Sequence, residues 1–220
     1  MLDKARSLLQ PSRRSAVPPF MVMDVMAAAA RLEAQGRRIV HMEVGQPAAA
    51  APSTAIAAAH SALLSGPLGY TETLGIASLR HRIARSYRDW HGLDVDPQRI
   101  VVTTGSSGGF ILAFLAAFEA GDRVAVALPG YPPYRHILTA LGCEPVGIEC
   151  TPETRWSLVG ETLLREHHAR PLKGVVVASP ANPTGTMMRE EALADLIRCA
   201  EDAGIAVISD EIYHGLDYAH

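Results

Sequence analysis

The sequence predicts a three-layer α/β/α fold, in which helices cover both faces of a mainly parallel β-sheet. Two observations carry this prediction. From residue 100 onward, short apolar segments alternate with longer helical ones, as they do in parallel sheets with crossover helices. The polar and glycine-rich motifs also follow the predicted strands, at the edge where such sheets bind their ligands.

Length, charge and cysteine content argue against several classes of protein. The chain has 220 residues, 48% of them hydrophobic, and a formal net charge of -3. These values are typical of a soluble globular protein and not of one that binds nucleic acid or an anionic membrane. The apolar run at 20–30 contains Asp24 and is too short to span a bilayer. Cys143, Cys150 and Cys199 lack the spacing of a zinc site or a disulfide framework, which favours a cytoplasmic setting and no bound metal.

Before residue 100 the pattern predicts an arm, helices and turns. The first 19 residues are rich in Pro and Arg and show no sustained periodicity. Apolar residues then recur at helical spacing, and Gly36 stands where a C-terminal helix cap would be. The predicted helices lie at 20–35, within 48–64 and at 79–90, and 41–44 is a strand-like piece that leads to a turn.

After residue 100 strands and helices alternate. The predicted strands are the short apolar segments 100–103, 123–127, 145–149, 174–178 and 205–209. The predicted helices between them are 107–119, 134–141, 158–167 and 190–203. Elements of these lengths and in this order indicate a parallel sheet with helical crossovers.

A run of small residues at 103–109 joins the first predicted strand to an apolar helix. It contains Ser106 and Ser107 and three glycines. Free backbone N–H groups at a helix start, together with hydroxyl donors, can hold a phosphate group. The run is neither a Walker loop nor GxGxxG, and such turns also serve as simple strand-to-helix connections.

Two further motifs follow later strands. Tyr131 is flanked by prolines in Pro129-Gly130-Tyr131-Pro132-Pro133, so its ring could stack on a planar heterocycle or simply fill the turn. Asn182 lies in Asn182-Pro183-Thr184-Gly185 and could donate a hydrogen bond to a phenolate-type oxygen. An isolated turn of this kind is more often structural.

Asp210 ends the last predicted strand, and Tyr213 follows three residues later. A carboxylate that contacts a pyridine nitrogen keeps that nitrogen protonated and strengthens the ring as an electron sink. The Asp210-Glu211 pair could instead be a metal-ligand pair or a solvated loop edge. No cluster of histidines supports a metal site, because His167 and His168 are adjacent and His214 stands alone.

Taken in order, these motifs resemble the fold-type I pyridoxal-phosphate enzymes, and within them the class I/II, aspartate-aminotransferase-like group. The resemblance covers about residues 20–220. It implies pyridoxal 5'-phosphate as cofactor, an arm and helix at 1–40 that form part of a small domain, and a large domain at 41–220. The residues that it implies for cofactor binding are Ser106 and Ser107 at the phosphate, Tyr131 on the ring, Asn182 and Tyr213 at the 3-hydroxyl oxygen, and Asp210 at the pyridine nitrogen.

Two more residues take roles from the same resemblance. Gly45 matches the glycine turn beside the substrate carboxylate. Tyr70 matches a tyrosine that binds the cofactor phosphate of the neighbouring subunit. The resemblance therefore implies a homodimer with shared active sites.

The sequence departs from this family in its lysines. Only Lys4 and Lys173 are present, whereas the family's Schiff-base lysine follows the Asp-x-x-Tyr segment. We expect that lysine, and two substrate- or phosphate-binding arginines, beyond His220. We expect no catalytic residue within the chain, a large domain that is incomplete at its C-terminus, and a gap in the sheet between 100–103 and 205–209. A chain with such a gap would expose strand edges and fold poorly alone.

The resulting functional hypothesis is a transaminase that passes an amino group between an amino acid and a 2-oxo acid. We expect the 220-residue chain alone to be inactive. Two alternatives remain at this point: a lyase or decarboxylase that uses the same cofactor site, and a noncatalytic ligand-binding relative. The sequence does not name the amino donor.

Overall fold

The computed structural model describes residues 10–46 and 49–216. The chain divides into two compact units, one made of residues 20–103 and the other of residues 1–19 and 104–220. We call them the helical unit and the sheet unit, and we describe each by itself. These two units do not correspond to the small-domain and large-domain parts expected on either side of residue 40. That domain boundary stays a prediction.

The described part of the helical unit contains three α-helices, and all three were predicted. They are α2 (Met21–Ala34), α3 (Ser53–Ser65) and α4 (Ala77–His91), followed by the 3-10 turn η2 (Pro97–Arg99). Gly92 ends α4 with a φ of 68°, a conformation that glycine adopts at little cost. The segment 41–44, predicted as strand-like, forms no strand, because no neighbouring strand of the described chain pairs with it.

A buried arginine fastens the loop that precedes α4. The Arg80 guanidinium donates hydrogen bonds to the Gly75 carbonyl oxygen at 2.9 Å and to the Glu72 carboxylate at 2.7 Å. It donates a third bond to the Pro97 carbonyl oxygen at 3.1 Å. A buried charge is costly unless it is paired and hydrogen-bonded in this way. The loop 69–75, which carries Tyr70, is therefore anchored at its C-terminal end.

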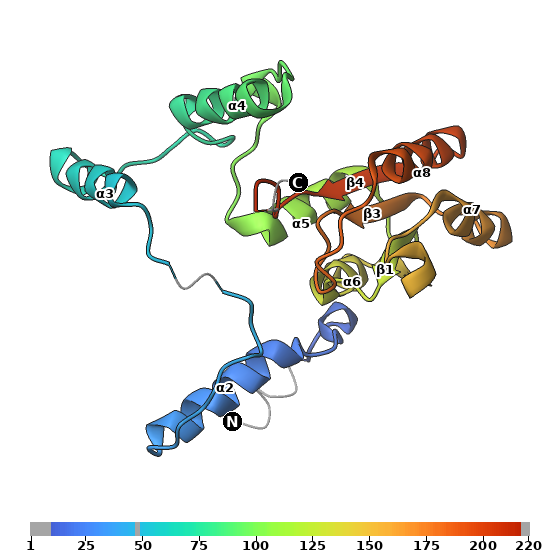
Figure 1. The fold of residues 1–220 in the computed structure, drawn as a ribbon, viewed down its shortest axis with the longest axis horizontal. Helices are drawn as coiled ribbons and strands as arrows, with labels where there is room; N and C mark the ends of the chain where they lie inside the picture. The colour runs from blue at the N-terminus through green and yellow to red at the C-terminus, as the bar shows by residue number, and fades with distance from the viewer. Residues whose placement is uncertain (1–9, 47–48, 217–220) are drawn as a thin grey trace. The chain divides into compact units, whose positions relative to one another are not determined.

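The sheet unit is built on four parallel strands in the order β2-β1-β3-β4. They are β1 (Arg123–Leu128), β2 (Glu144–Glu149), β3 (Gly174–Ala178) and β4 (Ala206–Asp210). Figure 1 labels β1, β3 and β4. Four of the five predicted strands are thus confirmed, within one residue at each end. The order places the carboxyl ends of β1, β3 and β4 side by side.

Helices cover both faces of this sheet, which confirms the three-layer prediction. The helices are α5 (Gly105–Ala117), α6 (Pro132–Ala140), α7 (Gly160–Ala169) and α8 (Glu190–Asp202), with the short turns η1 (Arg13–Ser15) and η3 (Pro152–Thr154). One core forms between the sheet and α5 and α6, around Phe114 and Leu138. The other forms between the sheet and α7 and α8, around Leu163 and Leu196.

Successive side chains along a strand point to opposite faces of the sheet and so contribute to the two cores in turn. In β3, Val176 faces the α5–α6 core whereas Val175 and Val177 face the α7–α8 core, as the two-residue period of a strand requires. Because both faces of the sheet are covered, these strands are apolar throughout and not alternately polar. Gly174 begins β3 where the Phe118 ring packs; a Cβ there would lie 2.2 Å from Phe118 Cζ.

The predicted strand at 100–103 is wrong for the described chain. These residues form no strand, and the Val102 N–H group donates a 2.9 Å hydrogen bond to the Leu74 carbonyl oxygen within the helical unit. Apolar β-branched residues favour a strand only where a neighbouring strand can pair with them. In the described chain β4 is an edge strand, and segment 100–103 does not pair with it.

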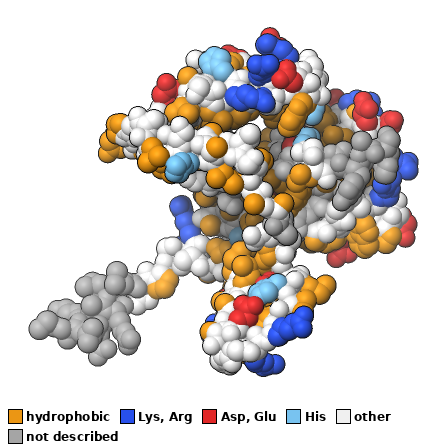
Figure 2. All heavy atoms as spheres, turned by 60° about the vertical axis from the view of Figure 1, so that its left-hand side comes forward, with side chains coloured by type: hydrophobic (Ala, Val, Ile, Leu, Met, Phe, Trp, Pro, Cys, Tyr) orange, Lys and Arg blue, Asp and Glu red, His pale blue; other side chains and the backbone are white. Residues whose placement is uncertain are grey.

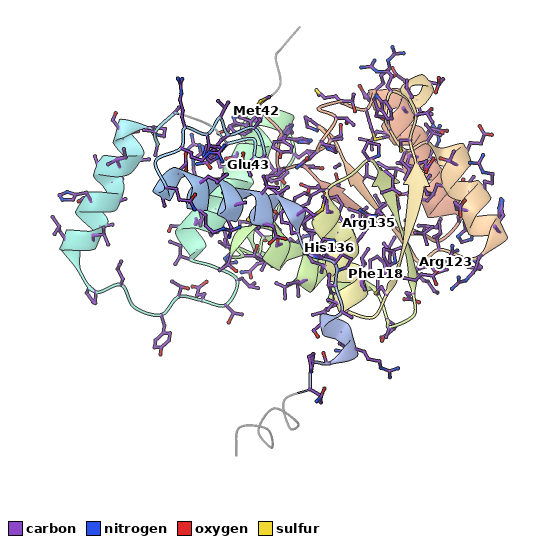
Figure 3. The ribbon with its side chains drawn as sticks, turned by 90° about the horizontal axis from the view of Figure 1, so that it is seen from below. Met42, Glu43, Phe118, Arg123, Arg135 and His136 are labelled. Atoms are coloured by element: carbon purple, nitrogen blue, oxygen red, sulfur yellow. The ribbon has the colours of Figure 1, made fainter. Side chains whose placement is uncertain are left out.

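Charged side chains form ion pairs at the amino-terminal edge of the sheet. Arg123 of β1, labelled in Figure 3, donates a 3.2 Å hydrogen bond to the Glu144 carboxylate, and Arg170 contacts the same carboxylate. The paired guanidinium groups, Arg170 first, hold the pKa of the Glu144 carboxyl below its usual value. Lys173 precedes β3 and donates its backbone N–H to the Arg123 carbonyl oxygen, so it lies at this amino edge, opposite the carboxyl ends of the strands.

Large hydrophobic side chains are also exposed, as the space-filling view of one face illustrates (Figure 2). On α5, Ile111, Leu112 and Leu115 face away from the core that Phe110 and Phe114 join. Among the residues that the structure describes, no helix is both long and apolar enough to cross a membrane.

Candidate active site

Strand register brings the later motifs to one edge of the sheet. Ala178, the last residue of β3, pairs with Asp210, the last residue of β4. The loop that carries Asn182 leaves β3 there, and Tyr131 follows β1, the neighbour of β3 on the other side. The carboxyl ends of three adjacent strands therefore present an amide, a carboxylate and a phenol, as expected from the sequence.

Asp210 is a buried and doubly hydrogen-bonded group at this edge. Its side chain is buried, with 9% of the residue exposed. The Tyr134 hydroxyl donates to Oδ2, and the Ile212 N–H donates to Oδ1 at 3.1 Å. Both carboxylate oxygens thus have a donor, which offsets the cost of burying a charge.

Tyr131 and Tyr134 form a packed aromatic pair above the ends of β1 and β3. Their ring centroids lie 5.4 Å apart at an interplanar angle of 79°, an edge-to-face arrangement that aromatic rings favour. Burial raises the pKa of the Tyr131 hydroxyl, with smaller contributions from Tyr213 and Asp210 in the same direction. The Ser107 side chain hydrogen-bonds to this hydroxyl and acts in the opposite direction, so the start of α5 lies at the same site.

A pocket opens beside these residues. Tyr131, Tyr134 and Asn182 line it together with the apolar side chains of Trp156, Leu158 and Met188. Gly130 leads into it from β1, and a Cβ at Gly130 would lie 2.3 Å from the Ala127 carbonyl oxygen. Only glycine fits this turn without a backbone shift, and the turn sets the position of Tyr131.

The loop after β3 is held by its own hydrogen bonds. The Gly185 N–H donates to the Ala181 carbonyl oxygen at 2.7 Å, and Gly185 has a φ of 66°. Ser179 joins this loop to the turn after β4, because His214 Nε2 lies 3.0 Å from the Ser179 carbonyl oxygen. Asn182 and Tyr213 are therefore carried by two segments that are tied to each other.

The structure places the predicted site residues in two groups. Ser107, Tyr131, Asn182, Asp210 and Tyr213 gather at the carboxyl edge of the sheet unit. Ser106 lies beside Ser107 in the first turn of α5 and is exposed. Gly45 and Tyr70 belong to the helical unit and are exposed, and their roles stay predictions.

Sequence reasoning missed Tyr134 as a site residue. It was expected only as the start of a helix, yet its hydroxyl contacts Asp210 across 76 residues of sequence. The available signal was its spacing: Tyr134 lies three residues after Tyr131, at the start of α6, where residues three apart share a helix face. No sequence signal pointed to Trp156. This residue lines the pocket, and its backbone has a φ of 58°.

The polar and aromatic groups of this edge suit a planar, phosphorylated heterocycle. They comprise one carboxylate for a protonated ring nitrogen, an amide and a phenol for an oxygen, an aromatic face, and a helix start with hydroxyls for a phosphate. Among the described residues, no group of three or more His, Cys, Asp or Glu side chains could hold a metal ion.

The family model for aminotransferase class I and II matches residues 37–220. The chain belongs to the class I and II aminotransferase family. Membership of this family implies pyridoxal phosphate as cofactor.

Individual aminotransferases agree with this membership. The chain is 53% identical over 205 residues to a valine–pyruvate aminotransferase of Mycobacterium tuberculosis, a match that covers 93% of this chain and 52% of the relative. Among solved structures, an aminotransferase from the same organism matches with a TM-score of 0.90 and 52% identity over 95% of this chain and 54% of that one.

A more distant structure has the same fold. The aspartate aminotransferase of Thermus thermophilus with maleate matches with a TM-score of 0.90 at 33% identity, over 96% of this chain and 55% of that one. The chain thus spans about half the length of the relatives that it matches. The fold class predicted from sequence, the pyridoxal-phosphate-dependent transferase fold, is confirmed.

Proposed function

We propose that the whole protein is a pyridoxal-phosphate-dependent aminotransferase that transfers an amino group from an amino acid to a 2-oxo acid. The observation that carries the proposal is the convergence of Asp210, Asn182 and Tyr131 at the carboxyl ends of three adjacent strands. Membership of the aminotransferase family supports it. When bound, pyridoxal phosphate supplies an electron sink that stabilises negative charge at the substrate α-carbon.

The residues of the chain would bind and orient this cofactor. Asp210 would accept a hydrogen bond from the protonated ring nitrogen, and its burial keeps competing water away. Asn182 and Tyr213 would donate to the ring oxygen. Tyr131 would pack against the ring, and its raised pKa keeps its hydroxyl protonated at neutral pH. Ser106 and Ser107, at the start of α5, would donate to the phosphate.

Residues of the helical unit complete the proposal. Gly45 would lie beside the substrate carboxylate. Tyr70 is fully exposed on the loop that Arg80 anchors, and we infer that it binds the phosphate in the site of a second subunit. The proposed assembly is therefore a homodimer in which each site uses residues of both subunits.

The named relative supports a choice of substrates for the first test. The Mycobacterium tuberculosis enzyme carries valine and pyruvate in its name, and we propose small neutral amino acids and their 2-oxo acids for this protein. The whole protein, loaded with pyridoxal phosphate, is incubated with valine and pyruvate, and separately with aspartate and pyruvate. Mass spectrometry then follows the formation of alanine.

We expect valine and pyruvate to give 3-methyl-2-oxobutanoate and alanine in equal amounts, since the amino group only changes carrier. Alanine from aspartate but not from valine would reject the substrate proposal and keep the reaction. Release of carbon dioxide or ammonia without alanine would reject amino transfer in favour of a decarboxylase or lyase. No cofactor binding at all would reject the proposed function.

A further inference from the structure

Within the described residues, the Asp210 carboxylate accepts hydrogen bonds from two donors, one a side chain and the other a backbone N–H group. The Ile212 N–H is part of the turn that follows β4, and it donates to Oδ1 at 3.1 Å. The Tyr134 hydroxyl reaches Oδ2 from α6, across the carboxyl end of the sheet. The orientation of the carboxylate is thus fixed from two separate elements.

Tyr134 is itself held rigidly. It is 6% exposed, and the Phe110 ring packs edge-on against it with ring centroids 5.0 Å apart. Tyr131 packs on it at 5.4 Å. Burial raises the pKa of the Tyr134 hydroxyl, and Asp210 raises it further. The phenol therefore stays protonated at neutral pH and acts as the donor of this hydrogen bond.

Among residues 10–46 and 49–216, no paired cation offsets the charge of Asp210. In the part of the chain that the structure describes, Asp210 forms no ion pair with a Lys, Arg or His side chain. Arg135 and His136 directly follow Tyr134 on α6 (Figure 3). The titratable groups that act on the Tyr134–Asp210 pair are Tyr131, which precedes α6, and Tyr213, on the turn after β4. Tyr131 and Tyr213 are neutral phenols, and among the described residues Tyr134 is the side chain that donates a hydrogen bond to Asp210.

We propose that Tyr134 is a positioning residue for the proposed cofactor site, which orients the Asp210 carboxylate and moderates the charge that it presents to the ring nitrogen. This inference rests on the proposed function. A carboxylate that receives a strong hydrogen bond attracts a second proton less strongly. With Tyr134 in place, the Asp210 carboxylate would therefore hold a proton on the ring nitrogen less strongly than an unpaired carboxylate would.

The first test uses Tyr134→Phe in the whole protein loaded with pyridoxal phosphate. The measured quantity is the pH at the midpoint of the absorption change that accompanies loss of the ring-nitrogen proton of the bound cofactor. We expect this midpoint to rise by about half a pH unit or more, because the phenyl ring keeps the packing and removes only the donor. The matched control is Tyr87→Phe on α4, whose ring contacts His91. A midpoint equal to that of the control would overturn the proposal.

A second arm separates charge from packing. In an Asp210→Asn background the same Tyr134→Phe change should move the midpoint by less than about a fifth of a unit, because no carboxylate remains to be moderated. An equal shift in both backgrounds would mean that Tyr134 acts through packing and would also overturn the proposal.

If Tyr134→Phe does not fold, 3-fluorotyrosine at residue 134 gives the opposite test. It is a stronger donor of nearly the same size, and the midpoint should then fall; an unchanged midpoint would contradict the inference. These outcomes are distinct from failure of the proposed function, which would appear as a wild-type protein that does not bind pyridoxal phosphate.

Discussion

Ala178 and Asp210 are register partners at the ends of β3 and β4. This pairing places the loop that carries Asn182 beside the carboxylate of Asp210, although the two residues are 28 positions apart in sequence. Because β1 lies on the other side of β3, Tyr131 joins them. The proposed site is thus a product of sheet topology, with each residue supplied by a different strand end.

Asp210→Asn should weaken pyridoxal phosphate binding. The change removes the negative charge but keeps an acceptor of the same size, so it tests the charge-assisted hydrogen bond to the ring nitrogen. Such bonds are worth about 1.5–3 kcal/mol, which corresponds to roughly a tenfold to hundredfold loss of affinity. Equilibrium titration of the whole protein with the cofactor measures it.

The matched control for this change is Asp202→Asn. Asp202 ends α8 and is exposed, so its substitution should leave the affinity unchanged. Equal affinities of wild type and Asp210→Asn would show that the carboxylate does not contact the cofactor.

Mixing two inactive variants should restore activity if sites are shared between subunits. Tyr70→Phe impairs the partner's site and Asp210→Asn impairs the subunit's own, so a mixed dimer retains one intact site. Equal amounts of the two, after exchange of subunits, should give about a quarter of the wild-type number of sites. Amino-transfer rates measure the recovery. Activity no greater than the mean of the separate variants would argue against a shared site.

Gly174→Ala should destabilise the sheet unit. The added methyl group would lie 2.2 Å from Phe118 Cζ, so the buried ring must shift, and overpacking of this kind costs about 1–3 kcal/mol. Chemical denaturation of the whole protein measures the free energy of unfolding. Gly66→Ala is the control, because a Cβ at Gly66 meets nothing within 4 Å. An equal effect of both changes would contradict the packing described for β3.

His41 should remain protonated well above neutral pH. Hydrogen bonds to Glu43, at 2.6 Å, and Glu33, at 3.0 Å, raise its pKa from 6.5 to about 9; Figure 3 labels Glu43. The sign follows from the raised pKa: the contribution of His41 to stability is fully present below pH 6.5 and is lost as the pH rises through about 9. Titration of the ring by NMR, with His41→Gln for assignment, measures this pKa. A titration at the ordinary value would contradict the contacts.

Much of this arrangement could be predicted because it depends on local signals. The apolar run 174–178 is a strand in any covered parallel sheet, and Asp210 had to lie at a carboxyl edge once 205–209 was assigned as a strand. The contact between Tyr134 and Asp210 joins the start of α6 to the end of β4, two strands away from β1 in the sheet, and no local pattern specifies it.

At segment 100–103 the sequence predicted a strand that the described chain does not form. Its composition favours a strand, but strand formation requires a partner, and in the described chain its hydrogen bond goes to Leu74 instead. The left-handed backbone conformation of Trp156 could not be predicted either, because tryptophan seldom adopts that conformation and the neighbouring residues give no signal for it.

The most direct measurement is a crystal structure of the whole protein with pyridoxal phosphate bound. We predict the ring nitrogen within hydrogen-bonding distance of Asp210, the ring oxygen beside Asn182 and Tyr213, and the phosphate at the start of α5. A cofactor bound elsewhere, or one whose ring nitrogen faces away from Asp210, would contradict this prediction.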